Sequence, residues 1–181
     1  MNEQVPIEVS DREGVIMSQP SSGKSRLSRI AAKEVPHRKS DRFFAAKSEV
    51  KASCEQLSLD VKRSALHEAM KIDLLQAVDR VHQLVREVTE DTPGGRNEMV
   101  ELEKQVEHLQ LAEKWSNAAA RVLDRLGPNG AKESRDSVLE AQDKVMWCVR
   151  ADQWDGQLTA ALSVLTIAVQ EAEAHASRVT T

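Results

Sequence analysis

Few residues of this chain have the types and spacing that catalysis or ligand binding requires. The segment SSGKS at residues 21–25 matches the end of a phosphate-binding loop. The complete loop also needs a glycine five residues before its Gly-Lys pair, together with a preceding strand and a following helix. Position 18 is Ser18, and the surrounding residues show no strand pattern. We therefore interpret the match as a coincidence of composition.

Histidine and carboxylate side chains do not form a metal-binding pattern either. His67 is followed by Glu68, as in the helix of zinc proteases, but the position of the second histidine holds Lys71. Glu171 and His175 are four residues apart and share one helix face, which gives only two ligands. Zinc sites use at least three protein ligands, so we expect a surface pair and no metal site.

The two cysteines, Cys54 and Cys148, are far apart and belong to no CxxC motif. A nucleophilic cysteine needs a neighbouring base and a group that orients this base, and no such motif surrounds either residue. Both are typical of small core residues in a reducing compartment. The sequence thus predicts no catalytic, cofactor-binding or metal site.

The elements that would position side chains are helices. Aromatic residues make up 3% of the chain and Tyr is absent, so the core must consist of Leu, Val, Ala and Met, which suits helix–helix packing. No Gly or Pro occurs between Pro36 and Pro93. Apolar residues there recur at spacings of three and four, which is helical periodicity. We predict an all-α fold, namely an elongated three-helix, or four-helix, bundle or coiled coil.

The helical domain is expected over residues 42–177, with helices at about 42–91, 97–126 and 131–177 and a frayed end at 178–181. The segments TPGGRN and LGPNG are strong turn signals between these helices. Such helices would be about 75, 45 and 68 Å long. The long ones must therefore project beyond the middle one, or break near Ser58–Ser64, where the apolar stripe changes phase, and near Asp155–Gly156.

Residues 1–41 are expected to be a disordered or extended tail, rich in Ser and holding three of the five prolines. Residues 1–42 have a net charge of +2 and the rest of the chain has −6. The positive charge is concentrated in a basic cluster that comprises Lys24, Arg26, Arg29, Lys33, Arg38, Lys39 and Arg42. This cluster is typical of nuclear-localisation or nucleic-acid-binding segments, and equally of a solvated linker. Ser28 and Ser40 follow basic residues as kinase sites do.

Two patterns near the C-terminus predict contact with a partner. Leu158, Leu162, Leu165 and Val169 have the spacing of a heptad seam. Trp147 and Trp154 are seven residues apart, which places them on one face of a continuous helix. They either fill the core of a bundle or bind a partner, because Trp is enriched at interface hot spots.

These observations favour a non-catalytic scaffold or adaptor subunit that assembles with itself or with other helical proteins. The alternative is an oligomeric factor that binds nucleic acid through its basic tail, and an enzyme whose polar groups converge from separate helices is a third class. No run of 18 apolar residues and no signal-peptide pattern is present. We therefore expect a cytoplasmic or nuclear location, no secretion and no transmembrane segment.

Overall fold

The computed structural model describes the backbone of residues 26–127, 131–154 and 156–179, and side chains from residue 40 to residue 178 within these ranges. All the regular structure in the described residues is helical, which confirms the all-α fold class. The five helices are α1 (Arg26–Arg63), α2 (Glu68–Glu87), α3 (Gly95–Leu126), α4 (Lys132–Arg150) and α5 (Gly156–Val179). The chain divides at Pro36 into two units, and the packing described below is that of residues 37–181.

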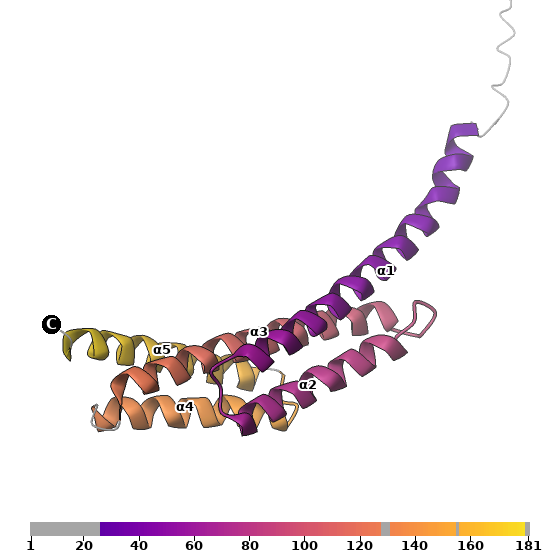
Figure 1. The fold of residues 1–181 in the computed structure, drawn as a ribbon. Coiled ribbons are helices and arrows are strands. Elements are labelled where there is room, and N and C mark those ends of the chain that lie inside the picture. Colours follow the sequence, from indigo (N-terminus) through magenta and orange to yellow (C-terminus); the bar gives the residue numbers. More distant parts are fainter. Residues whose placement is uncertain (1–25, 128–130, 155, 180–181) are drawn as a thin grey trace, which may run out of the picture. The chain divides into compact units, whose positions relative to one another are not determined.

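The long helix α3 is shared by two sets of neighbours (Figure 1). Its first half packs beside α1 and α2, and its second half packs beside α4 and α5. Arg42 of α1 lies across a shallow hollow from Arg96 of α3, and Ala65, two residues after the end of α1, is hydrogen-bonded to Asn117. Helices α1 and α3 therefore run side by side in the same direction, and α2, which connects them in the sequence, runs antiparallel to both.

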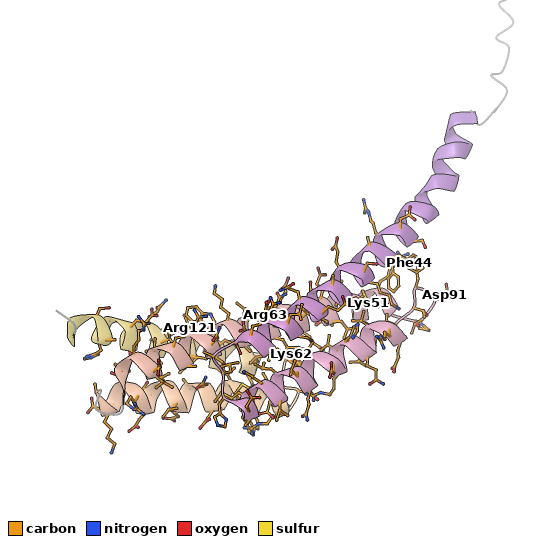
Figure 2. All side chains as sticks on the ribbon, viewed as in Figure 1. Phe44, Lys51, Lys62, Arg63, Asp91 and Arg121 are labelled. Carbon is orange, nitrogen blue, oxygen red and sulfur yellow. The ribbon has the colours of Figure 1, made fainter. Side chains whose placement is uncertain are left out.

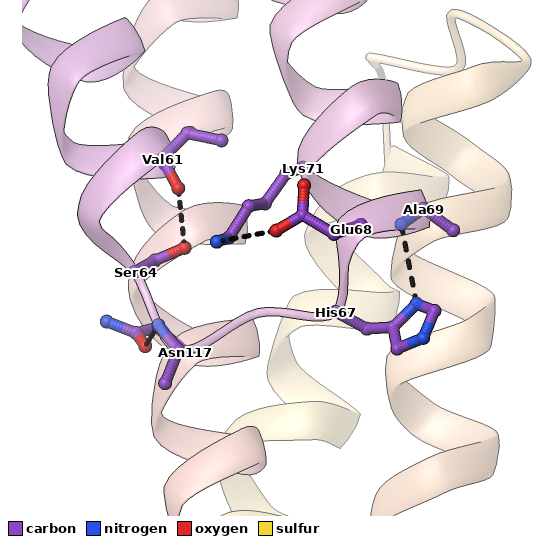
Figure 3. A network of polar contacts seen from close by, with 8 residues as sticks. Val61, Ser64, His67, Glu68, Ala69, Lys71 and Asn117 are labelled. Carbon is purple, nitrogen blue, oxygen red and sulfur yellow. Dashed lines mark hydrogen bonds and ion pairs between the residues drawn. The ribbon is translucent and has the colours of Figure 1, made fainter.

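The expected helix over residues 42–91 is two helices, because the chain breaks between Arg63 and Glu68 (Figure 3). The hydroxyl of Ser64 donates to the Val61 carbonyl at 2.7 Å, which ends α1. The backbone N–H of Ala65 donates to the side-chain oxygen of Asn117 at 2.9 Å, and this bond fixes the connection to α3. His67 then caps α2, because its Nδ1 accepts the N–H of Ala69 at 3.4 Å.

The expected helix over residues 131–177 is also two helices. The N–H of Ala151 bonds to the Trp147 carbonyl, and the N–H of Gln153 bonds to the Cys148 carbonyl, so α4 ends with a turn. Asp152 in this turn has a φ of 51°. This left-handed conformation stops a helix. The two long helices expected from the sequence are therefore broken, one between Arg63 and Glu68 and the other between Arg150 and Gly156.

Helix α1 begins at Arg26, inside the segment expected to be a tail. Residues 26–41 lack a sustained apolar stripe but are rich in Ala, Arg, Lys and Glu, which have high helix propensity, although Pro36 disfavours a helix interior. Residues 1–25, with Lys24 and the SSGKS segment, lie outside the described residues.

Candidate functional site: an apolar face on α4 and α5

The exposed side of α5 lacks charged residues over most of its length. From Gly156 to Gln170 the sequence contains no Asp, Glu, Lys or Arg. Two large apolar side chains are exposed here, Val164 at 50% and Ile167 at 55%. Together with exposed Ala160 they have spacings of four and three, so they form one stripe along the helix. The opposite stripe of α5 packs in the core.

Helix α4 contributes Trp147, which is 53% exposed. The start of α4 lies beside the end of α5, where Ser137 and Glu171 line the same shallow hollow. Trp147 follows Ser137 by ten residues on one α4 stripe, through Glu140 and Lys144. Glu171 likewise continues the α5 stripe of Ala160, Val164 and Ile167. Both stripes therefore lie on the same side of the antiparallel pair.

We call this surface the α4/α5 face and define it as Trp147, Ala160, Val164 and Ile167. Its polar neighbours on α5 are the uncharged Gln157, Thr159, Ser163 and Gln170, all of them exposed. The cores of protein interfaces are depleted in charged residues and enriched in aromatic ones. The α5 part of the α4/α5 face has this composition, whereas Trp147 on α4 has the exposed charged side chains of Asp143 and Lys144 one helical turn away.

Exposed apolar residues on the other helices have a different setting. Phe44 on α1 is exposed (Figure 2), and the charged residues Asp41 and Lys47 lie one helical turn before and after it. Ile72 on α2 lies between Lys71 and Asp73 in the sequence. Single apolar residues among charges are normal on a protein surface. A charge-free helix face of this length is therefore the more informative feature.

The predicted heptad seam faces inward. Leu158, Leu162, Leu165 and Val169 are all buried in the core that α5 shares with α3 and α4. Contacts within the chain occupy these four side chains, so a partner would reach them only if the helices separated. As a surface for a partner in the folded chain, the seam prediction needs correction.

The two tryptophans do not belong to one helix. Because α4 ends at Arg150, the seven-residue spacing does not fix their relative direction. Trp154 lies in the turn after α4 and is partly buried against the core. It lines a hollow of about 380 Å³ with Gln105 and His108 of α3. Only Trp147, of the six predicted partner-binding residues, presents a largely open side chain.

The α4/α5 face was missed from the sequence, although a signal was present. The segment QLTAALSVLTIAVQ has two apolar stripes, and the heptad explained only one of them. A helix packed against two neighbours buries one wide stripe and normally has charges on the rest of its surface. The absence of charged residues from 156 to 170 therefore indicated that the outer stripe differs from an ordinary solvated helix surface.

The basic cluster is described only at its end. Lys24 lies outside the described residues, and the backbone of Arg26, Arg29, Lys33, Arg38 and Lys39 is helical but their side chains are not described. Arg42 is exposed and lines a hollow of about 320 Å³ between α1 and α3, with Phe43, Met99 and Val100. Ser28 likewise has no described side chain, whereas the hydroxyl of Ser40 is hydrogen-bonded to Glu90.

Neither of the two cysteines has the lowered pKa of a reactive thiol. Burial, followed by the nearby carboxylates of Glu55 and Asp79, raises the pKa of the Cys54 thiol to about 11. Burial also raises the pKa of Cys148, partly offset by Lys144. At neutral pH both groups are thiols and therefore poor nucleophiles.

No group of three or more His, Cys, Asp or Glu side chains among the described residues is placed to hold a metal ion. Glu171 and His175 line an open hollow of about 440 Å³ together with Arg178. None of the described helices is long and apolar enough to cross a membrane. Comparison of the chain with protein-family models, curated proteins and solved structures finds no match.

Proposed function

We propose that this protein is a non-catalytic helical scaffold or adaptor subunit that assembles with helical protein chains through the α4/α5 face. The observations that support this proposal are the outer stripe of α5, which exposes Val164 and Ile167 and has no charged residue from 156 to 170, and the exposed Trp147 on α4 beside it. Burying such side chains releases apolar surface from water, which stabilises an assembly by roughly 25 cal/mol per Å². Trp is also one of the residues that most often dominates binding energy.

The architecture supports the same proposal. The inner stripe of α5 already forms a packed core with the buried residues of α3 and α4. The outer stripe is therefore not needed for folding. An exposed helix stripe with spacings of four and three is also the shape that a second helix recognises. A cytoplasmic or nuclear location and a role of the basic cluster in binding nucleic acid stay predictions.

The test compares two isoleucines of nearly equal exposure. Ile167→Glu changes a residue of the α4/α5 face that is 55% exposed, and Ile72→Glu changes a residue of α2 that is 53% exposed. We expect both variants to keep the circular dichroism and melting temperature of the wild type to a similar degree. Only Ile167→Glu should lose assembly in a native extract.

Assembly is detected by photo-crosslinking. A photoreactive amino acid replaces Ser163 beside the face or, as the control, Ala52 on the exposed side of α1. Crosslinks to protein should form from position 163, disappear when Ile167→Glu is added, and be absent from position 52. Equal crosslinking from both positions, or crosslinking from 163 that Ile167→Glu does not reduce, would contradict the proposal.

A further inference from the structure

We infer that the occupant of the α4/α5 face is a second copy of this chain, packed antiparallel about a two-fold axis. This inference rests on the proposed function, because it names the partner for the same face. Two-fold dimers use one self-complementary surface patch on both subunits. The charges of the patch must therefore not repel those of the same patch on the second copy.

The charge of the chain restricts where two copies can meet. The whole chain has a net charge of −4, and residues 43–181 hold 23 acidic and 17 basic residues. Two identical surfaces with an excess of one charge repel each other. The outer side of α5 over residues 156–170 has no charge, so two copies of this segment meet without repulsion.

The charges that border the face are self-complementary. Glu140 and Lys144 are exposed and lie on the α4 stripe that leads to Trp147. Within the described residues neither side chain has an ion-pair partner closer than 4 Å. An antiparallel two-fold arrangement reverses the order of these residues in the second copy. Glu140 of each copy then lies toward Lys144 of the other, on both sides of the axis.

The size of the surface suits a dimer. Helix α4 has 19 residues, so the pair of helices offers a strip about 28 Å long. Two helices about 10 Å apart make the strip about 20 Å wide, which gives an area on the order of 560 Å². Each partner in a standard interface contributes about 800 Å². Two copies would bury on the order of 1,120 Å² in total, below the about 1,600 Å² of a standard interface and in the range of weak dimers.

The experiment is sedimentation equilibrium of the purified full-length chain and its variants. We expect a monomer–dimer equilibrium for the wild type at concentrations up to about 100 µM. Ile167→Glu should weaken dimerisation by roughly 100-fold or more, because it buries an unpaired charge. Ile72→Glu should leave the dissociation constant unchanged. If Ile167→Glu fails to fold, Ser163→Glu places the same charge at an exposed helical position.

The charge-reversal series tests the antiparallel geometry. Glu140→Lys and Lys144→Glu should each weaken the dimer by roughly tenfold, because each creates two like-charge contacts. The double variant exchanges the two charges and should restore the wild-type constant.

Three results would overturn the inference: a wild-type chain that is monomeric at about 100 µM, a dimer that Ile72→Glu weakens as much as Ile167→Glu does, or a double variant that stays weak. A monomeric wild type would overturn the dimer alone. The crosslinking experiment would still test the proposed function, because it detects binding to a different protein. The two failures are therefore distinguishable.

Discussion

The side-chain amide of Gln142 on α4 donates a hydrogen bond to the main-chain carbonyl oxygen of Ser116 on α3 at 3.0 Å. Both residues are almost completely buried, and they are the two buried polar residues in the described part of the core. The bond fixes the position of α4 along α3. The hydroxyl of Ser116 itself has no hydrogen-bond partner, so the two polar groups have opposite effects on stability.

Replacing these residues separates the two effects. Gln142→Ala should lower the free energy of unfolding by about 1–3 kcal/mol, because it removes a buried hydrogen bond and leaves a cavity. Ser116→Ala should leave stability unchanged or raise it by up to about 1 kcal/mol, since it removes an unpaired buried hydroxyl and improves helix propensity. Urea unfolding of the purified variants measures both. A Ser116→Ala variant that is clearly less stable than the wild type would show that the hydroxyl has a partner in solution.

The inner stripe of α5 allows a second prediction. Leu165 is fully buried, so Leu165→Ala should cost about 2–5 kcal/mol, a large part of the about 5–15 kcal/mol of a typical domain. Ile167→Ala, two residues away on the outer stripe, should change stability by less than about 1 kcal/mol. Thermal unfolding of the isolated chain measures the difference. If Leu165→Ala kept its melting temperature while assembly was lost, the seam would face a partner after all.

Sequence patterns predicted the helices where apolar spacing and turn residues agreed. The apolar stripe of α3 and the TPGGRN turn gave a helix over 97–126, and the structure has Gly95–Leu126. The phase change after Val61 predicted a bend, a break or a change of packing partner near Ser58–Ser64, and α1 ends at Arg63. Both features are local, because they depend on residues within one or two helical turns.

Features that depend on tertiary contacts were not predictable in the same way. The turn after Arg150 contains Asp152 in a left-handed conformation, which propensity favours in glycine. The prediction that Trp147 and Trp154 share a face assumed one continuous helix. This turn ends α4 before Trp154, so the spacing of seven residues no longer places the two side chains on one face. The bond between Asn117 and Ala65 joins residues 52 positions apart, and no local pattern indicates it.

Asp152 is the subject of the third prediction. Its carboxylate accepts hydrogen bonds from Nη2 and Nε of Arg80 on α2, at 2.8 and 3.2 Å. Asp152→Ala and Asp152→Gly both remove this exposed ion pair, which contributes about 0–1 kcal/mol. Glycine tolerates the left-handed backbone and alanine does not. Asp152→Gly should therefore be more stable than Asp152→Ala by about 1 kcal/mol. Equal unfolding midpoints for the two variants in urea would show that the turn relaxes to another conformation.

The fourth prediction concerns pH. Partial burial, followed by the negative charge of Asp60, raises the pKa of the Glu113 carboxyl on α3 above its ordinary value of 4.5, and Arg121 offsets part of this effect. Because the pKa of the folded state exceeds that of the unfolded state, the protonated group favours folding. This contribution is fully present below the unfolded pKa and is lost as pH rises through the folded pKa.

At pH 7 the ionised Glu113 therefore opposes folding, and Glu113→Gln should be more stable than the wild type. The difference should shrink as pH falls through the folded pKa and disappear below about pH 4.5, where both proteins have a neutral side chain at this position. Urea midpoints at pH 4 and pH 7 measure the effect. Asp60→Asn is the matched control, because it removes the neighbouring charge and should also stabilise the wild type at pH 7. It should have a smaller effect in the Glu113→Gln background, since the repulsion between the two carboxylates is then already absent. An equal gain from Asp60→Asn in both backgrounds would show that the two carboxylates do not interact.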